Sequence, residues 1–453
     1  MLNKNLFKEF NSVSAKEWKH QIQADLKGAD YNDSLVWESL EGIKVKPFYH
    51  HDDFEYLSIP TQDKDFEICQ SVFIDDSEIA NTIALDALAK GATSIQFVAN
   101  QTFDIDVLLH GFQDLKNKPK LYFKNNFIAA NFNKQLLNFF DDDRVCIQQD
   151  VIGNFALTGN WFSDKQTDLE ANNKLLQNKT KATLLQVNAS IYQNAGANIV
   201  QQVAYALAHA NEYIENNGVK SIARIQFEFS TGSNYFFEIA KLRAFQYLWS
   251  KLTAAHNKTA FANIVTKSSL RNKTLYDYNV NILRTSTENM SAVLGGALII
   301  NTTPYDVFFK KTNEFSQRIA RNQLLLLKEE NEFENARTYA KGSYYIEALT
   351  IEIAKKALEI FKNIEKAGGF LSELRKGTIQ SEINEAAKKE QNLFDTQELT
   401  LLGTNKYPNK EDKMGNELEL YPFLKKDKRQ TEIKPILAKR LAEKMEQERL
   451  ENE

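Results

Sequence analysis

Residues 281–297 read NILRTSTENMSAVLGGA. They predict a helix that is followed by a strand, and this alternation recurs along most of the chain. Their polar and apolar side chains have the spacing of an amphipathic helix. The apolar positions are Ile282, Met290, Val293 and Leu294. Gly295 and Gly296 then end the helix, and the apolar run 297–300 predicts a short buried strand. Phosphate-binding loops precede helices, whereas this glycine pair follows one, so we interpret the pair as a helix C-cap.

Eight apolar runs of strand length follow one another from residue 66 onward, and helical patterns separate them. The runs lie at 68–74, 93–99, 120–130, 144–149, 183–189, 222–229, 261–266 and 297–301. The clearest helical patterns cover 77–90, 198–216 and 235–256. Strands that alternate with helices form parallel β/α units, and eight units favour a closed (β/α)8 TIM barrel. An open doubly wound sheet is the alternative, because several runs are short.

The whole chain divides into four predicted segments. Residues 1–65 predict an N-terminal helix and an extended arm, and residues 66–341 form the (β/α)8 barrel. Residues 342–404 are expected to be a helical extension packed on the barrel. Residues 405–453 read as a polar linker that ends in a charged helix.

Further helices are predicted at both ends of the chain. The first begins at Ser14, which has capping-box spacing to Glu17, and ends near Gly28. In the C-terminal third, helices are expected over 313–340, 346–366 and 371–391. The last helix is expected to carry a docking face at four-residue spacing, made of Ile433, Leu437, Leu441 and Met445.

The composition indicates a cytoplasmic globular protein. Hydrophobic residues make up 43% of 453, which is enough for a large core. Acidic and basic residues are interspersed and the net charge is −4, so neither a nucleic acid nor a membrane surface is expected as a partner. No apolar run is long enough to span a bilayer, and the N-terminus lacks the apolar core of a signal peptide.

The cysteines and histidines predict no reactive or metal site. Cys69 and Cys146 lie in apolar strand runs, where buried and inert thiols are expected. None of the six histidines belongs to a metal-binding motif. His50 and His51 stand beside Asp52 and are interpreted as part of a solvated loop.

Six blocks of sequence resemble the acyl-CoA mutase family, and methylmalonyl-CoA mutase in particular. Besides 281–297 they are NYFFEIAKLRA (234–244), RIARNQLLLLKEE (318–330), GSYYIEALT (342–350), IEKAGG (364–369) and LLGTNKY (401–407). Their order and spacing are similar to those of the family's barrel domain. The N-terminal part, from SVSAKEWK to EGIKVKPFY, resembles the family's small subunit rather than its large one.

The resemblance implies a chemistry that this chain retains only in part. Large subunits of the family bind adenosylcobalamin in a C-terminal flavodoxin-like domain through a D-x-H-x-x-G loop. They thread the CoA substrate through the barrel and isomerise methylmalonyl-CoA and succinyl-CoA by radicals. This chain has no D-x-H-x-x-G, and only a polar linker and a helix follow Tyr407. No cofactor or metal is therefore expected on this chain, and adenosylcobalamin is expected on the partner subunit.

The substrate residues of the family are also replaced. Catalytic members carry a Tyr-His pair shortly before an A-G-A triplet, where this chain has Ser190 and Ile191 ahead of 195–197. No arginine occurs from residue 145 to 223, where the family places the arginine that pairs with the substrate carboxylate. The sequence SSLRNK (268–273) replaces a Q-T-S-G-W block, and NTT (301–303) replaces H-T-N. No catalytic residue is expected here.

The predicted function is the small subunit of a heterodimeric adenosylcobalamin-dependent methylmalonyl-CoA mutase. The subunit would itself be non-catalytic and would stabilise the catalytic large subunit, with the N-terminal helix and C-terminal arm as contact elements. Those arms could equally pack on their own barrel. A second hypothesis is a catalytic barrel completed by a separately encoded cobalamin-binding subunit, against which Ser190 and Ile191 count. A third is a regulatory barrel that binds a CoA ligand.

Overall fold

A computed structural model describes residues 9–61, 64–424 and 429–453. Parts of the predicted arm and linker, residues 1–8, 62–63 and 425–428, lie outside the described residues. Eight parallel strands form the centre of the molecule, in the order β6-β5-β4-β3-β10-β9-β8-β7. They are β3 Glu67–Phe73, β4 Ser94–Ala99, β5 Lys120–Asn125, β6 Val145–Ile147, β7 Leu185–Asn188, β8 Ile225–Thr231, β9 Asn263–Ser268 and β10 Ile299–Asn301.

The two end strands of this order, β6 and β7, meet and close the sheet. The backbone N–H of Ile147 donates to the carbonyl of Thr183 at 2.9 Å. Beyond β6, the N–H of Gln186 donates to the carbonyl of Gln149 at 2.9 Å, within a parallel bridge from Gln149 to Leu185. The prediction of a (β/α)8 TIM barrel is therefore confirmed, and the open doubly wound sheet is wrong.

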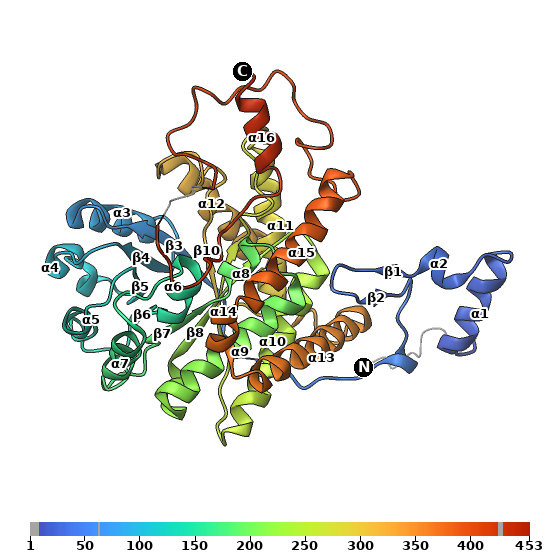
Figure 1. The fold of residues 1–453 in the computed structure, drawn as a ribbon, viewed down its shortest axis with the longest axis horizontal. Helices are drawn as coiled ribbons and strands as arrows, with labels where there is room; N and C mark the ends of the chain where they lie inside the picture. Colours follow the sequence, from blue (N-terminus) through green and yellow to red (C-terminus); the bar gives the residue numbers. More distant parts are fainter. Residues whose placement is uncertain (1–8, 62–63, 425–428) are drawn as a thin grey trace.

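Helices connect consecutive strands and surround the barrel (Figure 1). They are α3 Ser77–Ala89, α4 Ile105–Leu108, α5 Ala130–Leu137, α6 Val151–Thr158, α7 Lys165–Leu175, α8 Ser190–Asn194, α9 Ile199–Asn217, α10 Tyr235–Ala255, α11 Val280–Leu294 and α12 Glu314–Leu325. The strand and helix predictions for this region match the observed elements to within a few residues. The predicted run 120–130 is too long, because the strand ends at Asn125.

The glycine pair after α11 is required by close packing against α10. Gly296 has a φ of +88°, a conformation that favours glycine. A Cβ atom on Gly295 would lie 2.8 Å from a methyl carbon of Leu242. The side-chain amide of Gln246 donates to the Gly295 carbonyl at 2.8 Å. The interpretation of the pair as a C-cap that leads into β10 is confirmed.

The prediction of one helix over 313–340 is wrong. The α-helix ends at Leu325, and only short π and 3-10 turns follow, up to residue 338. Glu332 adopts a left-handed φ of +55°, which breaks the helical path. Arg337 then donates to the Gly296 carbonyl at 3.0 Å. This tertiary hydrogen bond draws the chain back to the barrel, and the apolar spacing of the sequence could not show it.

The helices of the C-terminal third pack beside the barrel. They are α13 Tyr344–Lys366, α14 Phe370–Lys376 and α15 Thr378–Asp395. The predicted helix 346–366 is confirmed, but the predicted helix 371–391 is two helices. Gly377, with a φ of +81°, separates them, because a left-handed residue cannot continue an α-helix.

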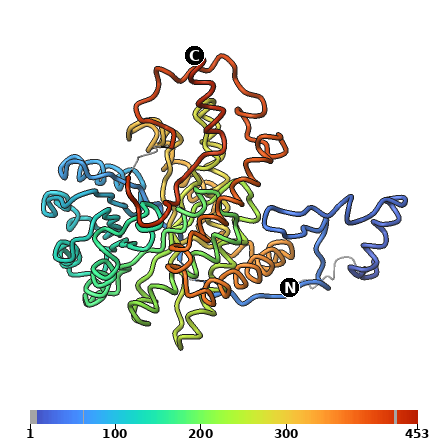
Figure 2. The backbone as a smooth tube through the Cα atoms, viewed as in Figure 1, coloured from blue at the N-terminus to red at the C-terminus, as the bar shows by residue number. Residues whose placement is uncertain are grey.

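The predicted helical stripe from Ile433 to Met445 is also wrong. Only α16, Glu443–Leu450, is helical, and residues 429–442, here called the C-terminal strap, are irregular. Pro435 lacks an N–H group, and the strap's backbone donors bond to the barrel instead. In Figure 2 the red C-terminal trace passes in front of the barrel before it rises to the C-terminus.

The helical part of the N-terminal arm projects away from the barrel, whereas its hairpin contacts the barrel helices (Figure 1). It contains α1 Ala15–Asp25, α2 Tyr31–Leu35 and a hairpin of β1 Trp37–Glu38 with β2 Lys44–Val45. The predicted capping box is confirmed, because Ser14 and Glu17 satisfy each other's backbone N–H groups. No residue of α1 is buried, and Trp18 is 52% exposed. The arm therefore presents apolar surface to its surroundings.

Candidate functional site

The interior of the barrel is filled by a layer of long polar side chains. Gln96 on β4 donates to Gln148 after β6 at 2.6 Å, and Gln148 donates to Gln226 on β8 at 2.6 Å. Asn301 on β10 donates to Gln96 at 2.8 Å. Side chains from alternate strands form one layer of a TIM barrel, and this layer has all four of its members. Each is at most 3% exposed, so the layer closes the barrel axis.

A charged group lies against this amide layer. The Glu228 carboxylate, 2% exposed, is 3.4 Å from the Lys124 ammonium group and 3.5 Å from that of Lys267. Lys267 also donates to Gln96 at 3.0 Å. Burial alone would raise the pKa of Glu228, but the two lysines together hold it below its ordinary value. Glu228, Lys124 and Lys267 therefore all have charged partners inside the protein.

Ser190 and Ile191, which the resemblance predicted to stand in place of a Tyr-His pair, lie on α8, after β7. Ser190 is 6% exposed, and Ile191 is 7% exposed and belongs to the main hydrophobic core. The Ser190 hydroxyl has no hydrogen-bond partner among the described residues. Neither side chain offers a hydrogen-bond donor to an open cavity.

The loop 268–273 after β9 directs its side chains to internal partners. Lys273 forms an ion pair of 2.7 Å with Glu288, and both side chains are 1% exposed. Burial lowers the pKa of Lys273, and Glu288 opposes that shift. Arg271 is paired with Glu390 on α15 and also donates to the Lys439 carbonyl at 2.8 Å. The loop therefore supports the fold around it.

The three residues of segment 301–303 have different surroundings. Asn301 belongs to the amide layer, whereas Thr302 and Thr303 are buried at 5% and 8% exposure. The Thr302 hydroxyl has no hydrogen-bond partner within the described part of the chain. Sequence comparison singled out this segment, but only the structure brings Asn301 together with the glutamines.

The C-terminal strap crosses the face of the barrel at the carboxyl ends of its strands. The N–H of Ile436 donates to Ala156 on α6 at 2.8 Å, and the N–H of Lys439 donates to Asn194 on α8 at 2.9 Å. The N–H of Leu441 donates to the Arg271 carbonyl at 2.9 Å. TIM-barrel enzymes keep their active sites on this face. Here the chain's own backbone lies over part of it.

Arg440 fixes the end of the strap. Its guanidinium group lies 4.3 Å from the ring centre of Phe308 and donates to the Lys273 carbonyl at 3.2 Å. It also pairs with Glu446, whose carboxylate is 2% exposed. Burial raises the pKa of Glu446, and Arg440 opposes that shift.

A buried cluster of polar side chains lies beneath α8. The Nε2 atom of His209 is 3.0 Å from the Asp150 carboxylate, and the Tyr213 hydroxyl donates to the same carboxylate at 2.7 Å. The Tyr192 hydroxyl lies 2.9 Å from Nδ1 of His209. Burial would raise the pKa of Asp150, but His209 and Tyr213 hold it below its ordinary value. His209 is fully buried, so the cluster joins the end of β6 to α8 and α9 as a structural element.

Sequence reasoning missed the amide layer, although the signal is present. A glutamine stands near the middle of the strand runs SIQFV, VCIQQ, LLQVN and RIQFE. Glutamine is uncommon inside parallel strands, which are usually rich in Val, Ile and Leu. Its recurrence at this position indicates a polar barrel interior. The contacts of Asp150 with Tyr213 and of Arg440 with Lys273 had no comparable signal, because these partners are far away in sequence.

The remaining sequence expectations are placed as follows. Cys69 and Cys146 are buried and free, and burial raises the pKa of the Cys69 thiol to about 12. His50 and His51 lie on the arm, in and before a short 3-10 turn. Among the described side chains, no three His, Cys, Asp or Glu groups converge as metal ligands would. No helix in residues 9–61, 64–424 or 429–453 combines the length and apolar content of a membrane span.

Comparison with known proteins identifies the family to which this chain is similar. The profile of the family Methylmalonyl-CoA mutase matches residues 131–452. The methylmalonyl-CoA mutase small subunit of Porphyromonas gingivalis is 34% identical, over 92% of this chain and 73% of its own length. The methylmalonyl-CoA mutase of Cereibacter sphaeroides is 27% identical, over 86% of this chain and 64% of its own length. The large subunit of the P. gingivalis enzyme is 29% identical, over 58% of this chain and 38% of its own length.

These matches differ in how much of the relative they cover. This chain spans less than two thirds of the length of the C. sphaeroides mutase and of the P. gingivalis large subunit. It spans 73% of the length of the P. gingivalis small subunit. The profile match alone covers more than half of the chain. On this profile match and the 34% identity to a small subunit, the chain belongs to the methylmalonyl-CoA mutase family.

Proposed function

We propose that this chain is the non-catalytic small subunit of a heterodimeric adenosylcobalamin-dependent methylmalonyl-CoA mutase. Its role is to stabilise the catalytic large subunit, which interconverts methylmalonyl-CoA and succinyl-CoA. The observation that carries the proposal is the amide layer of Gln96, Gln148, Gln226 and Asn301 across the barrel axis. A substrate that runs along the axis would have to displace all four side chains and their hydrogen bonds.

The surroundings of α8 support a non-catalytic role. Stabilising a thioester carbonyl in a transition state requires a hydrogen-bond donor aimed at its oxygen. Ile191 has no such donor and packs in the core. The lysines nearest the axis, Lys124 and Lys267, already face the carboxylate of Glu228. A catalytic barrel completed by a separate cobalamin subunit would need both an open axis and a free donor, so these contacts count against it.

Two observations support the proposal that adenosylcobalamin is bound by the large subunit. A cobalt-ligating histidine must be able to reach the corrin from a surface position. His209 is fully buried between Asp150 and Tyr192, and the other five histidines, which are not buried, stand in no D-x-H-x-x-G loop. The strap lies over the face of the barrel where a cofactor would approach. The cofactor is therefore assigned to the large subunit.

The N-terminal arm is the proposed contact element for the large subunit. Trp18 is 52% exposed on α1, the part of the arm that stands away from the barrel (Figure 1). Trp37 and Leu40 on the hairpin are 52% and 40% exposed. Exposed aromatic and aliphatic groups on a projecting element are typical of an interface that a partner covers. The C-terminal strap, in contrast, is bound to its own barrel. The alternative of intramolecular packing thus suits the strap better than α1.

The test is to co-express this chain with a large subunit of the family and to purify each alone and both together. We expect a one-to-one complex that turns over methylmalonyl-CoA with adenosylcobalamin. We expect no turnover and no cobalamin binding by this chain alone, and a lower melting temperature for the large subunit alone. Turnover by the isolated chain, or failure of the two chains to associate, would refute the proposal.

A further inference from the structure

A groove of about 360 Å³ runs between α15 and the C-terminal strap. One wall comes from α15 and the other from residues 434–439, which are not helical. The backbone of the strap is held by the barrel through Ile436 and Lys439. Arg271 closes the base of the groove and is bound by Glu390 and the Lys439 carbonyl. Both walls are therefore held in place without an occupant.

The rim of the groove is positively charged. Lys388 on α15 and Lys434 and Lys439 on the strap line it, and all three are exposed. None of these ammonium groups forms an ion pair or hydrogen bond with a described side chain or backbone group. Among the described residues, Arg271 is the one other charged side chain that lines the groove, and no carboxylate lines it. This local charge is opposite to the net charge of the chain, −4.

The interior of the groove is apolar, with one unused hydrogen-bond acceptor. Ile383 and Ile436 are buried in its walls, and Leu437 is 39% exposed at its edge. Gln380 is only 4% exposed, and its amide nitrogen donates to the carbonyls of Leu374 and Lys434. Its Oε1 atom has no partner among the described residues. A buried acceptor of this kind favours an occupant that brings an N–H donor.

The other side of α15 has the opposite character. A cavity of about 630 Å³ lies there, and α15 lines it with three carboxylates, Glu382, Glu385 and Glu390, and one lysine, Lys389. Arg271 lines this cavity as well as the groove. The helix therefore separates a lysine-rimmed groove from a carboxylate-lined cavity. Like charges repel across an interface and opposite charges attract. An acidic occupant is accordingly directed to the lysine side and a basic one away from it.

We propose that this groove binds an acidic segment of the large subunit, in which carboxylates flank an apolar side chain. The lysines pair with the carboxylates, the apolar side chain packs between Ile383 and Leu437, and a backbone N–H donates to Gln380. The inference rests on the proposed function, since it names a second contact of the same heterodimer. It is distinct from the arm contact, because the groove is made by α15 and the strap.

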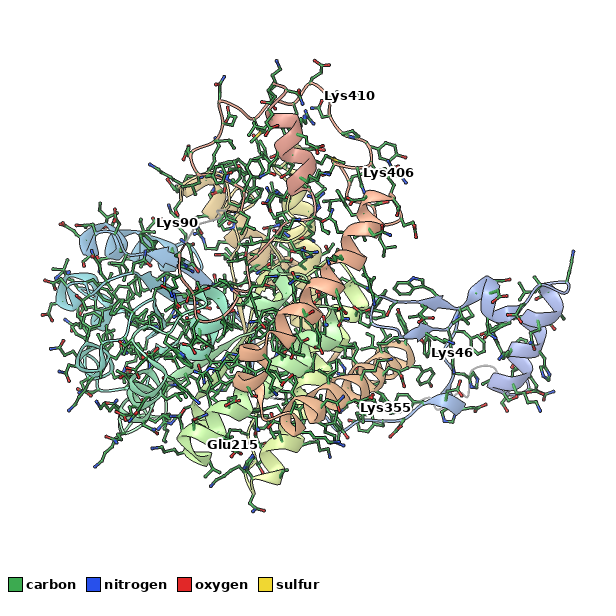
Figure 3. The ribbon with its side chains drawn as sticks, viewed as in Figure 1. Lys46, Lys90, Glu215, Lys355, Lys406 and Lys410 are labelled. Atoms are coloured by element: carbon green, nitrogen blue, oxygen red, sulfur yellow. The ribbon has the colours of Figure 1, made fainter. Side chains whose placement is uncertain are left out.

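The test compares two variants of equal charge change in the two-chain complex. K388E/K434E/K439E reverses the rim. K355E/K406E/K410E reverses three lysines on α13 and on the loops after α15, away from the groove (Figure 3). At about 50 mM salt we expect the rim variant to weaken the complex about tenfold or more, and the control to change the dissociation constant less than about threefold. At about 500 mM salt we expect the two variants to converge.

A neutral variant, K388A/K434A/K439A, provides a second measurement if the reversed rim lowers expression. It should weaken the complex less than charge reversal, and in the same direction. If the wild-type chains associate and the rim variants bind as tightly as the control, the groove is not a contact. The proposal of a heterodimer is then unaffected. An equal loss in the control also overturns the inference. If the wild-type chains do not associate at all, the proposed function itself fails.

Discussion

The side-chain amide of Gln96 on β4 donates a hydrogen bond of 2.6 Å to Gln148, which follows β6, across the barrel axis. Strands β4 and β6 are not neighbours in the sheet, because β5 lies between them. Both side chains are at most 3% exposed, so each satisfies a group that water cannot reach. The barrel axis is thus filled by a chain of amide hydrogen bonds that runs from Gln96 through Gln148 to Gln226.

Gln148→Ala should destabilise the isolated chain by about 2 to 3 kcal/mol, because it leaves a donor on Gln96 and an acceptor on Gln226 buried without partners. Urea unfolding followed by circular dichroism measures the change. Gln101→Ala, at an exposed position, is the control and should change stability by less than about 0.5 kcal/mol. Equal stability of the two variants would mean that the layer is not a closed network.

Ser190→Ala should leave both stability and turnover of the two-chain complex unchanged. The Ser190 hydroxyl is buried without a partner, so its removal takes away no hydrogen bond. We expect a change in unfolding free energy within about 0.5 kcal/mol and an unaltered kcat. Ile191→His should not create activity in the isolated chain, because the axis remains closed. A large loss of turnover with the complex intact would show that α8 takes part in catalysis.

Much of the fold could be predicted from the sequence because the barrel is built from local patterns. Each strand run is apolar and bounded by polar turns, and the helices between them have regular spacing. The strap illustrates what local pattern cannot decide. Ile433 and Leu441 are buried, as their spacing predicts, yet this part of the chain is not helical. Its N–H groups bond to Ala156 and Asn194, partners more than 200 residues away in sequence.

At the candidate site, the sequence predicted mainly which residues differ from those of the family. Resemblance singled out Ser190, Ile191 and the loop 268–273 as departures from the family. The resemblance could not show what fills the interior of the barrel, because that depends on which side chains meet there. Gln96 and Gln226 are 130 residues apart in the numbering of the sequence and meet through Gln148. Only strand order and register bring them together.

Asp150→Asn should lower stability at pH 7 by about 1 to 3 kcal/mol, because it replaces a carboxylate oxygen that accepts hydrogen bonds and leaves a buried donor among Tyr213, Gly153 and Asn188 unpaired. The pKa of Asp150 is lowered in the folded chain, so its carboxylate adds stability that is complete above the unfolded pKa of about 3.9. That stability is lost as the pH falls through the folded pKa. The gap between wild type and variant should therefore narrow below about pH 4 in denaturant titrations. A constant gap at every pH would contradict this account.

Arg440→Ala should release the strap from the barrel. The change leaves the Glu446 carboxylate buried and unpaired, and it removes the packing against Phe308. We expect a loss of about 3 kcal/mol or more and faster amide hydrogen exchange at Lys439 and Leu441. The double variant R440A/E446Q should recover part of the loss, because the uncompensated charge is gone. If exchange stays slow at both positions, other contacts hold the strap.

Trp18→Ser should weaken the two-chain complex without affecting the isolated chain. The Trp18 side chain is 52% exposed, and its ring contact with Phe48 is 5.9 Å between centroids, so its loss costs the isolated chain less than about 0.5 kcal/mol. A tryptophan that becomes buried in an interface contributes about 2 kcal/mol or more, which corresponds to roughly a thirtyfold weaker complex. Phe315→Ser on α12, 56% exposed and outside the arm, is the matched control. Isothermal titration of both variants against the large subunit makes the comparison, and equal affinities would assign the heterodimer contact to a surface other than the arm.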